Sequence, residues 1–513
     1  MINLDSIKLE NLNKPARYIG GEVNQVVKTD NVKSSIVLCY PNLYEKAMSS
    51  YIVNLLYNNI NIMDDVWCKR CFAPDIDFEK LLIKSDYELF SLEDYRSIRV
   101  SDILLFVIDS ELDFTNFFNM LNLAKIDIEK ENRNKKSPQI LILPINNINI
   151  KPIEKYADFV FSYESEKESI RRLLKYLKVT AQSSIVENIA SMDEITSNFE
   201  DTKIIHMEKS IVPSIKINNS SIIIDFNYMD DVDEIITYIE KNIKARGINT
   251  VSFLNYDKVN EYRFCECVYK IKTNVDNVRI LCKNIDFNKF EPNVIEVLLV
   301  CMEKTAVYFN VATCSKKIKN KTGIGTDRKK LLEKIEKAFK NNRNSIRLSF
   351  NIGLPEETYE DLDDIFLTLE DIVKMYSRNK ARDKFSMKVI LDYYIFTEKE
   401  NVKNAIDNIT KLETKVRYIA EKEYDNIIKI ELKDMNSYVT RLLLKNGWEE
   451  FSDTIFNAYK LGARFNNDSK LYNKNAWEKA MYDDSKIINN YFNIIWYKEI
   501  NNESNCNKQR SWI

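Results

Sequence analysis

The stretch SIIIDFNYMDDVDEII, residues 221–236, decides the fold of the second half of the chain. Its first residues are mostly apolar and predict a buried strand. The acidic run at its end predicts the start of a helix, because carboxylates favour helix N-termini. A polar turn of about three residues separates the two elements. Chemistry in a βα unit usually sits in that loop, so this connection leaves almost no room for a site.

Apolar and amphipathic segments alternate on both sides of this stretch. Before it, we predict strands at 34–41, 102–109 and 139–145 and helices at 43–60, 114–126 and 168–179. From it onward, we predict strands at 221–226, 249–254, 277–282, 305–311, 345–351, 385–396 and 427–432. In the first of these two series, strands that alternate with helices are typical of a mostly parallel sheet covered on both faces. The sequence therefore predicts an α/β protein.

The spacing of these elements also predicts the domains. The later series packs six or seven βα units into about 210 residues, which favours a full or partial (β/α) barrel over a doubly wound sheet. We expect an N-terminal arm at 1–30, a Rossmann-like domain at 31–180, a connector at 181–215, the barrel at 216–433 and a helical extension at 434–513.

Composition narrows the class of protein. The 513 residues carry a net charge of −2, which gives no electrostatic case for broad binding to nucleic acid or anionic membranes. No signal peptide or apolar run of membrane-spanning length is present, and the nine cysteines are scattered. We therefore expect a cytoplasmic protein with reduced thiols. His206 is the single histidine, so no site can use two imidazoles.

Residues 351–365, NIGLPEETYEDLDDI, give the sharpest local signal. Gly353 permits an unusual backbone angle, Pro355 stiffens the turn, and Thr358 with Asp361 fits a capping box for the next helix. One interpretation is a ligand-facing loop in which Gly353, Pro355 and Glu356 bind a cofactor. The favoured alternative on local grounds is a well-capped βα turn.

A second candidate lies near the start of the chain, in KPARYIGGE at 14–22. Arg17, Gly20, Gly21 and Glu22 concentrate charge and an adjacent glycine pair there. The segment lacks G-x-G-x-x-G spacing, so it is not a dinucleotide fingerprint. We favour a terminal arm packed across the domains over a binding site.

The cysteines predict neither a zinc site nor a redox motif. Cys68 and Cys71 form a C-x-x-C without a second ligand pair at suitable spacing. Cys265 and Cys267 lie on a predicted helix, where positions i and i+2 face different sides. We expect unliganded thiols and no metal site.

Several segments together resemble an uncharacterised bacterial radical S-adenosylmethionine (radical SAM) family that carries a cobalamin-binding-like domain before its barrel. The segments are KPARYIGGE, YPNLYEKAMSS, DVWCKRCFAP and LFSLEDYR near the start, then KIKNKTGIGTDRKKLLEKIEKAF, IRLSFNIGLPEETYEDL and NAYKLGARFNNDSKLYNKNAWEKAM. The resemblance runs from about residue 14 to 482. It implies a cobalamin-binding-like Rossmann domain and a radical-SAM-type barrel.

The resemblance also implies what is missing. In that family, a C-x-x-x-C-x-x-C loop after the first barrel strand holds a [4Fe–4S] cluster, whose open iron binds SAM. Here the chain passes from Phe226 directly into the following helix, and no such cysteines occur. The family's glycine-containing second loop is replaced by FLNYDKVNEY at 253–262, and its Pro-Glu-Ala-Gly stretch by NVATC at 310–314.

These departures predict a degenerate family member with no catalytic residues and no cofactor. SAM, [4Fe–4S] and cobalamin remain family associations. We expect a non-catalytic binding or scaffolding protein with an unknown protein or RNA partner, such as an active homologue. Candidate partner surfaces are the GLPEET turn and the aromatic segment at 489–500. The alternatives are an active enzyme whose cluster uses Cys265, Cys267 and Cys314, and a different enzyme that reuses the barrel mouth.

Overall fold

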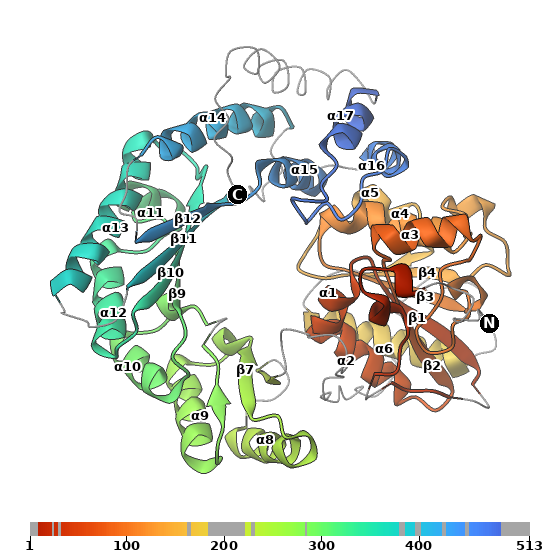
Figure 1. Cartoon of the computed structure of the whole chain (residues 1–513), viewed down its shortest axis with the longest axis horizontal. Coiled ribbons are helices and arrows are strands. Elements are labelled where there is room, and N and C mark those ends of the chain that lie inside the picture. Colours follow the sequence, from red (N-terminus) through yellow and green to blue (C-terminus); the bar gives the residue numbers. More distant parts are fainter. Residues whose placement is uncertain are drawn as a thin grey trace. The chain divides into compact units, whose positions relative to one another are not determined.

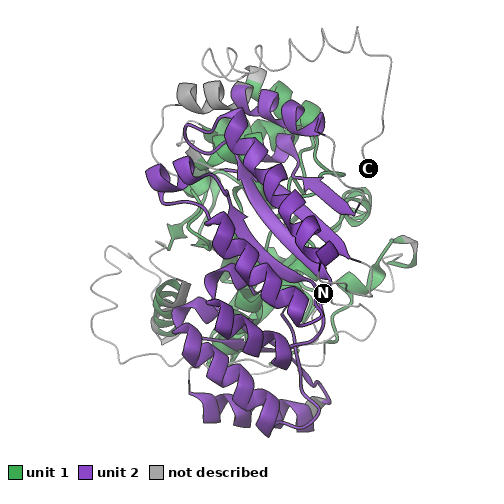
Figure 2. Cartoon of the chain, turned by 90° about the vertical axis from the view of Figure 1, so that its left-hand side faces the viewer, with its two compact units in different colours: residues 1–219, 439–513 green, residues 220–438 purple. Residues whose placement is uncertain are grey.

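The computed structural model describes residues 9–22, 25–28, 32–161, 166–182, 221–226, 231–282, 285–378, 385–394, 402–422, 427–446 and 451–483. The chain forms two compact units, which Figure 2 colours separately. Unit 1 comprises residues 1–219 and 439–513, and unit 2 comprises residues 220–438. Two segments singled out above, His206 and residues 489–500, lie outside the described residues.

Unit 1 contains a five-stranded parallel sheet in the order β2-β1-β3-β4-β5 (Figure 1). Its strands are β1 (Ser34–Tyr40), β2 (Val66–Phe72), β3 (Ile103–Ile108), β4 (Gln139–Pro144) and β5 (Phe159–Val160). Nearly every residue of the first three strands is buried, as expected for a parallel sheet with both faces covered. The strand order reverses between β1 and β3, which makes the carboxyl ends of these strands a topological switch point.

The helices of unit 1 come from both ends of the chain. The N-terminal segment supplies α1 (Tyr44–Ser49), α2 (Tyr51–Asn61), α3 (Ile76–Lys84), α4 (Phe114–Leu123), α5 (Lys151–Glu154) and α6 (Glu166–Gln182). Short 3₁₀ turns lie at Leu9–Asn11, Pro15–Tyr18, Ile98–Val100, Glu111–Asp113 and Lys130–Asn132. After unit 2 the chain adds α15 (Met435–Asn446), which crosses the boundary between the units, α16 (Phe451–Lys460) and α17 (Lys474–Asp483). The helix α16 packs against α4 and α5.

The single helix predicted at 43–60 is wrong, because the structure divides it at Ser50. The backbone of Ser50 is extended, and its hydroxyl oxygen accepts a hydrogen bond from the Val53 N–H, which starts α2. The side chain of Asn54 donates to the carbonyl oxygens of Met48 and Ser50 and so holds the break in place. Local side-chain bonds of this kind compete with a continuous helix.

Unit 2 contains two parallel sheets whose strands follow chain order. The first joins β6 (Ile222–Asp225), β7 (Thr250–Leu254) and β8 (Arg279–Ile280). The second joins β9 (Val307–Ala312), β10 (Ser345–Ile352), β11 (Ser386–Tyr393) and β12 (Ile428–Leu432). A parallel bridge pairs Asp286 with Tyr308 of β9. The seven strands predicted from residue 221 onward each overlap one of these strands, and the predicted α/β fold with parallel sheets is confirmed.

Helices alternate with the strands of unit 2: α8 (Val232–Arg246), α9 (Glu261–Asn274), α10 (Pro292–Cys301), α11 (Lys316–Thr322), α12 (Arg328–Lys340), α13 (Tyr359–Arg378) and α14 (Val402–Ala420). Figure 1 shows them on one side of the strands. Short 3₁₀ turns lie at Tyr256–Lys258 and Phe287–Lys289. The side chains of β11 alternate between buried and exposed, with Lys388 and Asp392 on the exposed face.

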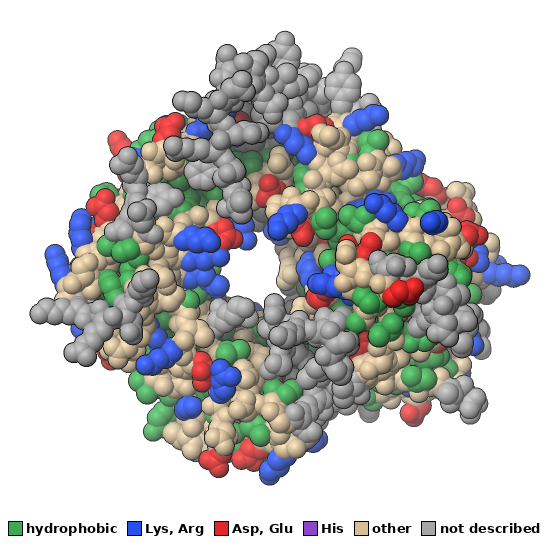
Figure 3. All heavy atoms as spheres, viewed as in Figure 1, with side chains coloured by type: hydrophobic (Ala, Val, Ile, Leu, Met, Phe, Trp, Pro, Cys, Tyr) green, Lys and Arg blue, Asp and Glu red, His purple; other side chains and the backbone are tan. Residues whose placement is uncertain are grey.

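Within the described ranges, no helix has both the length and the apolar character needed to cross a lipid bilayer. Figure 3 shows basic and acidic side chains interspersed around both units on the face it displays.

Candidate functional site

The connection between β6 and α8 is as short as the sequence predicts. Strand β6 ends at Asp225, and α8 is capped by Asp231, whose carboxylate accepts the Glu234 N–H at 2.9 Å. Residues 227–230 lie outside the described residues, and their sequence is Asn-Tyr-Met-Asp. No cysteine occurs between Ser221 and Asp257. The donor set required for a cluster loop of three thiolates is therefore missing from this position, and an iron–sulfur cluster does not fit it.

Polar groups at the carboxyl ends of β6 to β9 bind one another. The Asn255 side chain donates to Asp225 Oδ1 at 2.8 Å. The backbone N–H of Asp286 donates to the Tyr256 hydroxyl, and Asp286 Oδ1 accepts the Asn310 N–H, both at 2.8 Å. These contacts link each strand end to the next, so the donors and acceptors stabilise the edge of the fold.

The thiols of unit 2 are distributed over separate elements. Cys265 and Cys267 lie on α9, and Cys314 follows β9. Burial raises the pKa of Cys267 to about 12 and that of Cys314 to about 11, so both remain protonated near neutral pH. Cys282 Sγ lies 2.7 Å from Thr305 Oγ1. In the part of the chain that the structure describes, no group of three Cys, His, Asp or Glu residues is placed to hold a metal ion.

The GLPEET turn forms one wall of a pocket with a volume of about 430 Å³. Gly353, Pro355 and Glu356, the residues selected from the sequence, line this pocket opposite α14. Gly353 has a φ of +84°, the left-handed conformation that glycine adopts readily. Its N–H donates to the carboxylate of Glu357 at 2.8 Å, so the pocket wall is held by a side chain that the sequence analysis did not select.

Glu357 is the buried charge of this pocket. Its carboxylate pairs with Lys415 of α14 at 2.9 Å, and burial raises its pKa. Glu356 pairs with Lys321, whose hydrogen bond lowers the pKa of Glu356. The predicted capping interaction also forms, because Asp361 accepts the N–H of Thr358 at 2.7 Å. The turn is thus both capped, as the favoured alternative expects, and exposed to a pocket.

The N-terminal candidates hold the arm on unit 1. Arg17 is buried and pairs with Glu45 at 2.9 Å and Asp75 at 2.6 Å. Gly20 has a φ of +58°, and a Cβ atom there would lie 2.5 Å from the carbonyl oxygen of Leu92. Gly21 also has a positive φ, of +79°. The described contacts of this segment are packing and ion pairing within unit 1.

Glu22 belongs to a buried ion cluster centred on Arg70. Arg70 Nη2 lies 2.8 Å from Glu22, and Arg70 Nε lies 2.6 Å from Glu93. All three side chains are at most 1 % exposed, and the ring of Tyr57 lies 4.2 Å from the guanidinium carbon. Burial raises the pKa of Glu93. Sequence reasoning missed Arg70 and Glu93, although a Lys-Arg pair inside the otherwise apolar run VWCKRCF was the available signal.

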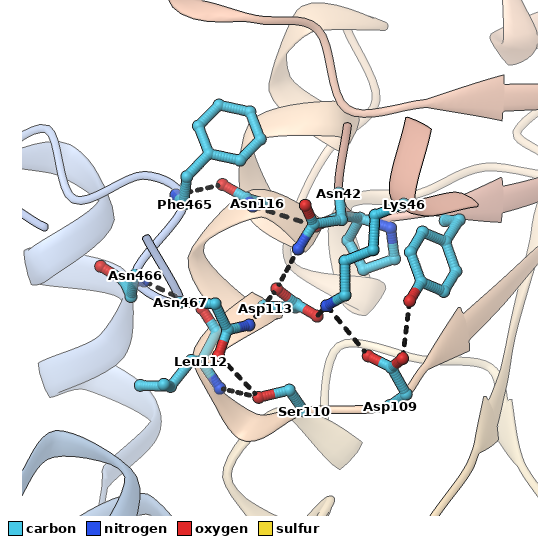
Figure 4. A network of polar contacts seen from close by, with 12 residues as sticks. Asn42, Lys46, Asp109, Ser110, Leu112, Asp113, Asn116, Phe465, Asn466 and Asn467 are labelled. Carbon is cyan, nitrogen blue, oxygen red and sulfur yellow. Dashed lines mark hydrogen bonds and ion pairs between the residues drawn. The ribbon is translucent and has the colours of Figure 1, made fainter. Parts of the chain in front are cut away.

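Figure 4 shows a second polar network, at the switch point of the unit 1 sheet. Asp113 is buried at the start of α4 and accepts hydrogen bonds from the side chains of Asn42 and Asn467, both at 2.9 Å. Lys46 lies 3.4 Å from Asp109 and 3.5 Å from Asp113. Burial, and secondarily the neighbouring charge of Asp109, raises the pKa of Asp113 to about 7.

The C-terminal segment of the chain covers this switch point. The Phe465 N–H donates to Asn116 Oδ1 at 3.1 Å, and the Asn466 side chain donates to the Leu112 carbonyl at 2.9 Å. The buried Trp477 donates its indole N–H to Asn466 Oδ1 at 2.8 Å. Ligands of such sheets usually bind in the crevice at this point. Here the chain's own residues 465–467 contact residues 110–116, which follow β3, a role that the sequence analysis missed.

Replacing Asp113 by asparagine should flatten the pH dependence of unit 1 stability. The folded pKa of Asp113 is raised from 3.8 to about 7, so its contribution is complete below about pH 4 and is lost as the pH rises through 7. Asp113→Asn keeps an acceptor for Asn42 and Asn467 but cannot ionise. The midpoint of urea unfolding should decrease less between pH 5 and pH 8 in the variant than in the wild type. Asp86→Asn, at a side chain that is 89 % exposed, is the control and should behave like the wild type.

Comparison with known families gives one match in the first half of the chain. Residues 53–199 match the family model described as radical SAM proteins, N-terminal, and the match supports a radical SAM relationship. The match includes most of α2, then β2, β3, β4 and β5. No curated protein matches the chain.

Proposed function

We propose that this protein is a radical SAM homologue that has lost its [4Fe–4S] site and acts as a non-catalytic binding or scaffolding protein. In this proposal, residues 31–180 are a cobalamin-binding-like domain and unit 2 is a partial radical-SAM-type (β/α) barrel. The N-terminal family match and the chain-order parallel strands of unit 2 support the assignment.

The observation that carries the proposal is the connection after β6. A site-differentiated cluster needs three thiolates close together, and one compact loop supplies them at small cost in chain entropy. Here only residues 226–230 separate β6 from the cap of α8, and none is cysteine. The neighbouring strand ends are linked by Asp225, Asn255 and Asp286 through contacts within the fold.

The first unit also lacks the usual protein ligand of cobalamin in its N-terminal part. Residues 1–205 contain no histidine, so no imidazole from this region can ligate cobalt. At the switch point, Asn467 instead bonds to Asp113, and Ser110 Oγ lies 3.3 Å from Asn467 Oδ1. We therefore propose that the cobalamin-binding-like domain, residues 31–180, binds no cobalamin through a histidine of its own. A titration with hydroxocobalamin that leaves the visible spectrum unchanged would support this.

The deciding experiment is anaerobic reconstitution with iron and sulfide. We expect well below one cluster per chain, no signal of a reduced cluster in electron paramagnetic resonance, and no 5′-deoxyadenosine after reduction with SAM. The double variant Cys282→Ala/Cys314→Ala removes the thiols beside the ends of β8 and β9 and serves as the control. The amount of iron bound nonspecifically should be the same in the wild type and the double variant.

About four irons per chain, lost in the double variant and accompanied by deoxyadenosine, would contradict the proposal. That result would establish an active radical enzyme with non-standard thiol ligands. Turnover of a small molecule without iron would instead favour a different enzyme that reuses the strand ends of unit 2.

A further inference from the structure

A short segment of unit 2 concentrates positive charge in a chain whose net charge is −2. Between Lys316 and Lys330 lie seven basic residues and one acidic residue. The segment follows β9 and comprises α11, a turn and the start of α12. Ile318 is buried and anchors α11, which ends at Gly323 with a φ of +70°. The charges are therefore carried by ordered, packed elements.

Part of this charge is neutralised by the neighbouring helix and turn. Three cations form ion pairs: Lys317 with Asp361, Lys321 with Glu356, and Arg328 with Asp371. Four lysines have no ion pair within the residues that the structure describes: Lys316, Lys319, Lys329 and Lys330. Lys319 is half-buried and the other three are exposed.

One carboxylate, that of Asp327, belongs to the same segment. Asp327 caps α12 and accepts the Lys330 N–H at 3.1 Å. Its pKa is lowered first by that hydrogen bond and further by the charges of Lys319 and Lys316 on α11. The charges of Lys316 and Lys319 on α11 thus act on the start of α12, where Lys329 and Lys330 follow Asp327 in the sequence. Asp327 is the single acidic residue of the segment, so a positive excess remains there.

We propose that Lys316, Lys319, Lys329 and Lys330 bind the phosphate backbone of a nucleic acid. The proposal rests on the proposed function and names the partner class of a non-catalytic protein. Each ammonium is a point charge suited to phosphate, and Arg328, whose planar fork could bind a phosphate or a carboxylate at two points, is already paired with Asp371. The segment contains no aromatic residue, so binding is electrostatic and independent of base sequence.

The net charge of the whole chain, −2, does not reveal this local group of four lysines. Counterion release depends on the number of phosphates contacted locally. The slope of log affinity against log salt concentration is about −0.9 per contact for duplex DNA and about −0.7 for single strands. Four contacts therefore give a plot of log affinity against log salt with a slope of about −3 to −4.

The test is fluorescence anisotropy with a labelled 20-nucleotide single strand and a 20-base-pair duplex, on the full chain between 50 and 200 mM salt. The variant replaces the four lysines by glutamine. A matched control replaces Lys80, Lys84, Lys135 and Lys136, which are exposed lysines of unit 1, and so changes the net charge equally. We expect the variant to lose at least about tenfold in affinity at 50 mM salt and most of the salt slope, and the control to change less than twofold.

Equal losses in the variant and the control would overturn the proposal, because whole-chain charge would then explain binding. Absence of wild-type binding, or displacement of the probe by polyglutamate as effectively as by unlabelled nucleic acid, would also overturn it, the latter in favour of an acidic protein segment. Iron content and deoxyadenosine are separate readouts, so failure of nucleic-acid binding is distinguishable from failure of the proposed non-catalytic function.

Discussion

Replacing Arg70 by methionine is expected to lower the free energy of unfolding of unit 1 by about 3–5 kcal/mol. The substitution keeps most of the apolar volume but removes the charge that Glu22 and Glu93 share in the interior of unit 1. Two carboxylates then remain buried without a cation, and desolvation opposes their ionisation. Hydrogen exchange of the β1 and β3 amides gives the change, since core strands exchange through global opening of the unit.

If the buried carboxylates cause the loss of stability, that loss should depend on pH. In Arg70→Met, the folded pKa of Glu93, which burial already raises, loses the opposing charge of Arg70 and lies above its unfolded value, so stability recovers as the pH falls and is lost as it rises. Lys33→Met is the control, because Lys33 is 64 % exposed and pairs with Asp65 at the surface, where such pairs contribute about 0–1 kcal/mol. Equal destabilisation by the two substitutions would refute a special role for the buried cluster.

Replacing Trp477 by alanine should cost about 3–5 kcal/mol and detach the C-terminal segment from the switch point. Trp477 is 2 % exposed, so the substitution leaves a large cavity, and it also removes the indole N–H that holds Asn466 Oδ1. Exchange should accelerate in residues 463–483 and in α4, whose Asn116 accepts the Phe465 N–H.

Trp477→Phe separates packing from hydrogen bonding. It fills most of the space but lacks the donor, so it should cost about 1–3 kcal/mol, the penalty of an unsatisfied buried polar group. Unchanged protection of residues 463–467 in Trp477→Ala would show that Asn466 and Asn467 hold the segment without the tryptophan.

The strands of unit 2 were predictable because each has apolar residues in a run or at alternate positions and because amphipathic helices separate them. Strand β2 was not predicted, because Lys69 and Arg70 interrupt its apolar pattern. Their partners, Asp94, Glu22 and Glu93, come from other parts of the sequence. The periodicity of apolar residues does not indicate such ion pairs. The break at Ser50 was missed because its cap competes with a helical pattern that is otherwise unbroken.

The candidate site residues also differ in whether a local sequence pattern marks them or a distant partner defines their role. Gly353 and Pro355 were identifiable because a strained turn needs particular residue types at adjacent positions. Glu357 was not, since its burial depends on Lys415 of α14. The contact of Asp113 with Asn467 joins residues 354 positions apart, and neither residue belongs to a local motif that marks the other.

That long separation has a consequence for synthesis. Unit 1 is discontinuous, and the 219 residues of unit 2 leave the ribosome before Phe465, Asn466 and Asn467 do. At elongation rates of about 5–20 residues per second, the gap lasts roughly 10–45 s. During this interval the nascent sheet has its strands but lacks the segment that covers the ends of β1 and β3. Domains usually fold as they emerge, whereas the first unit of this chain is completed last.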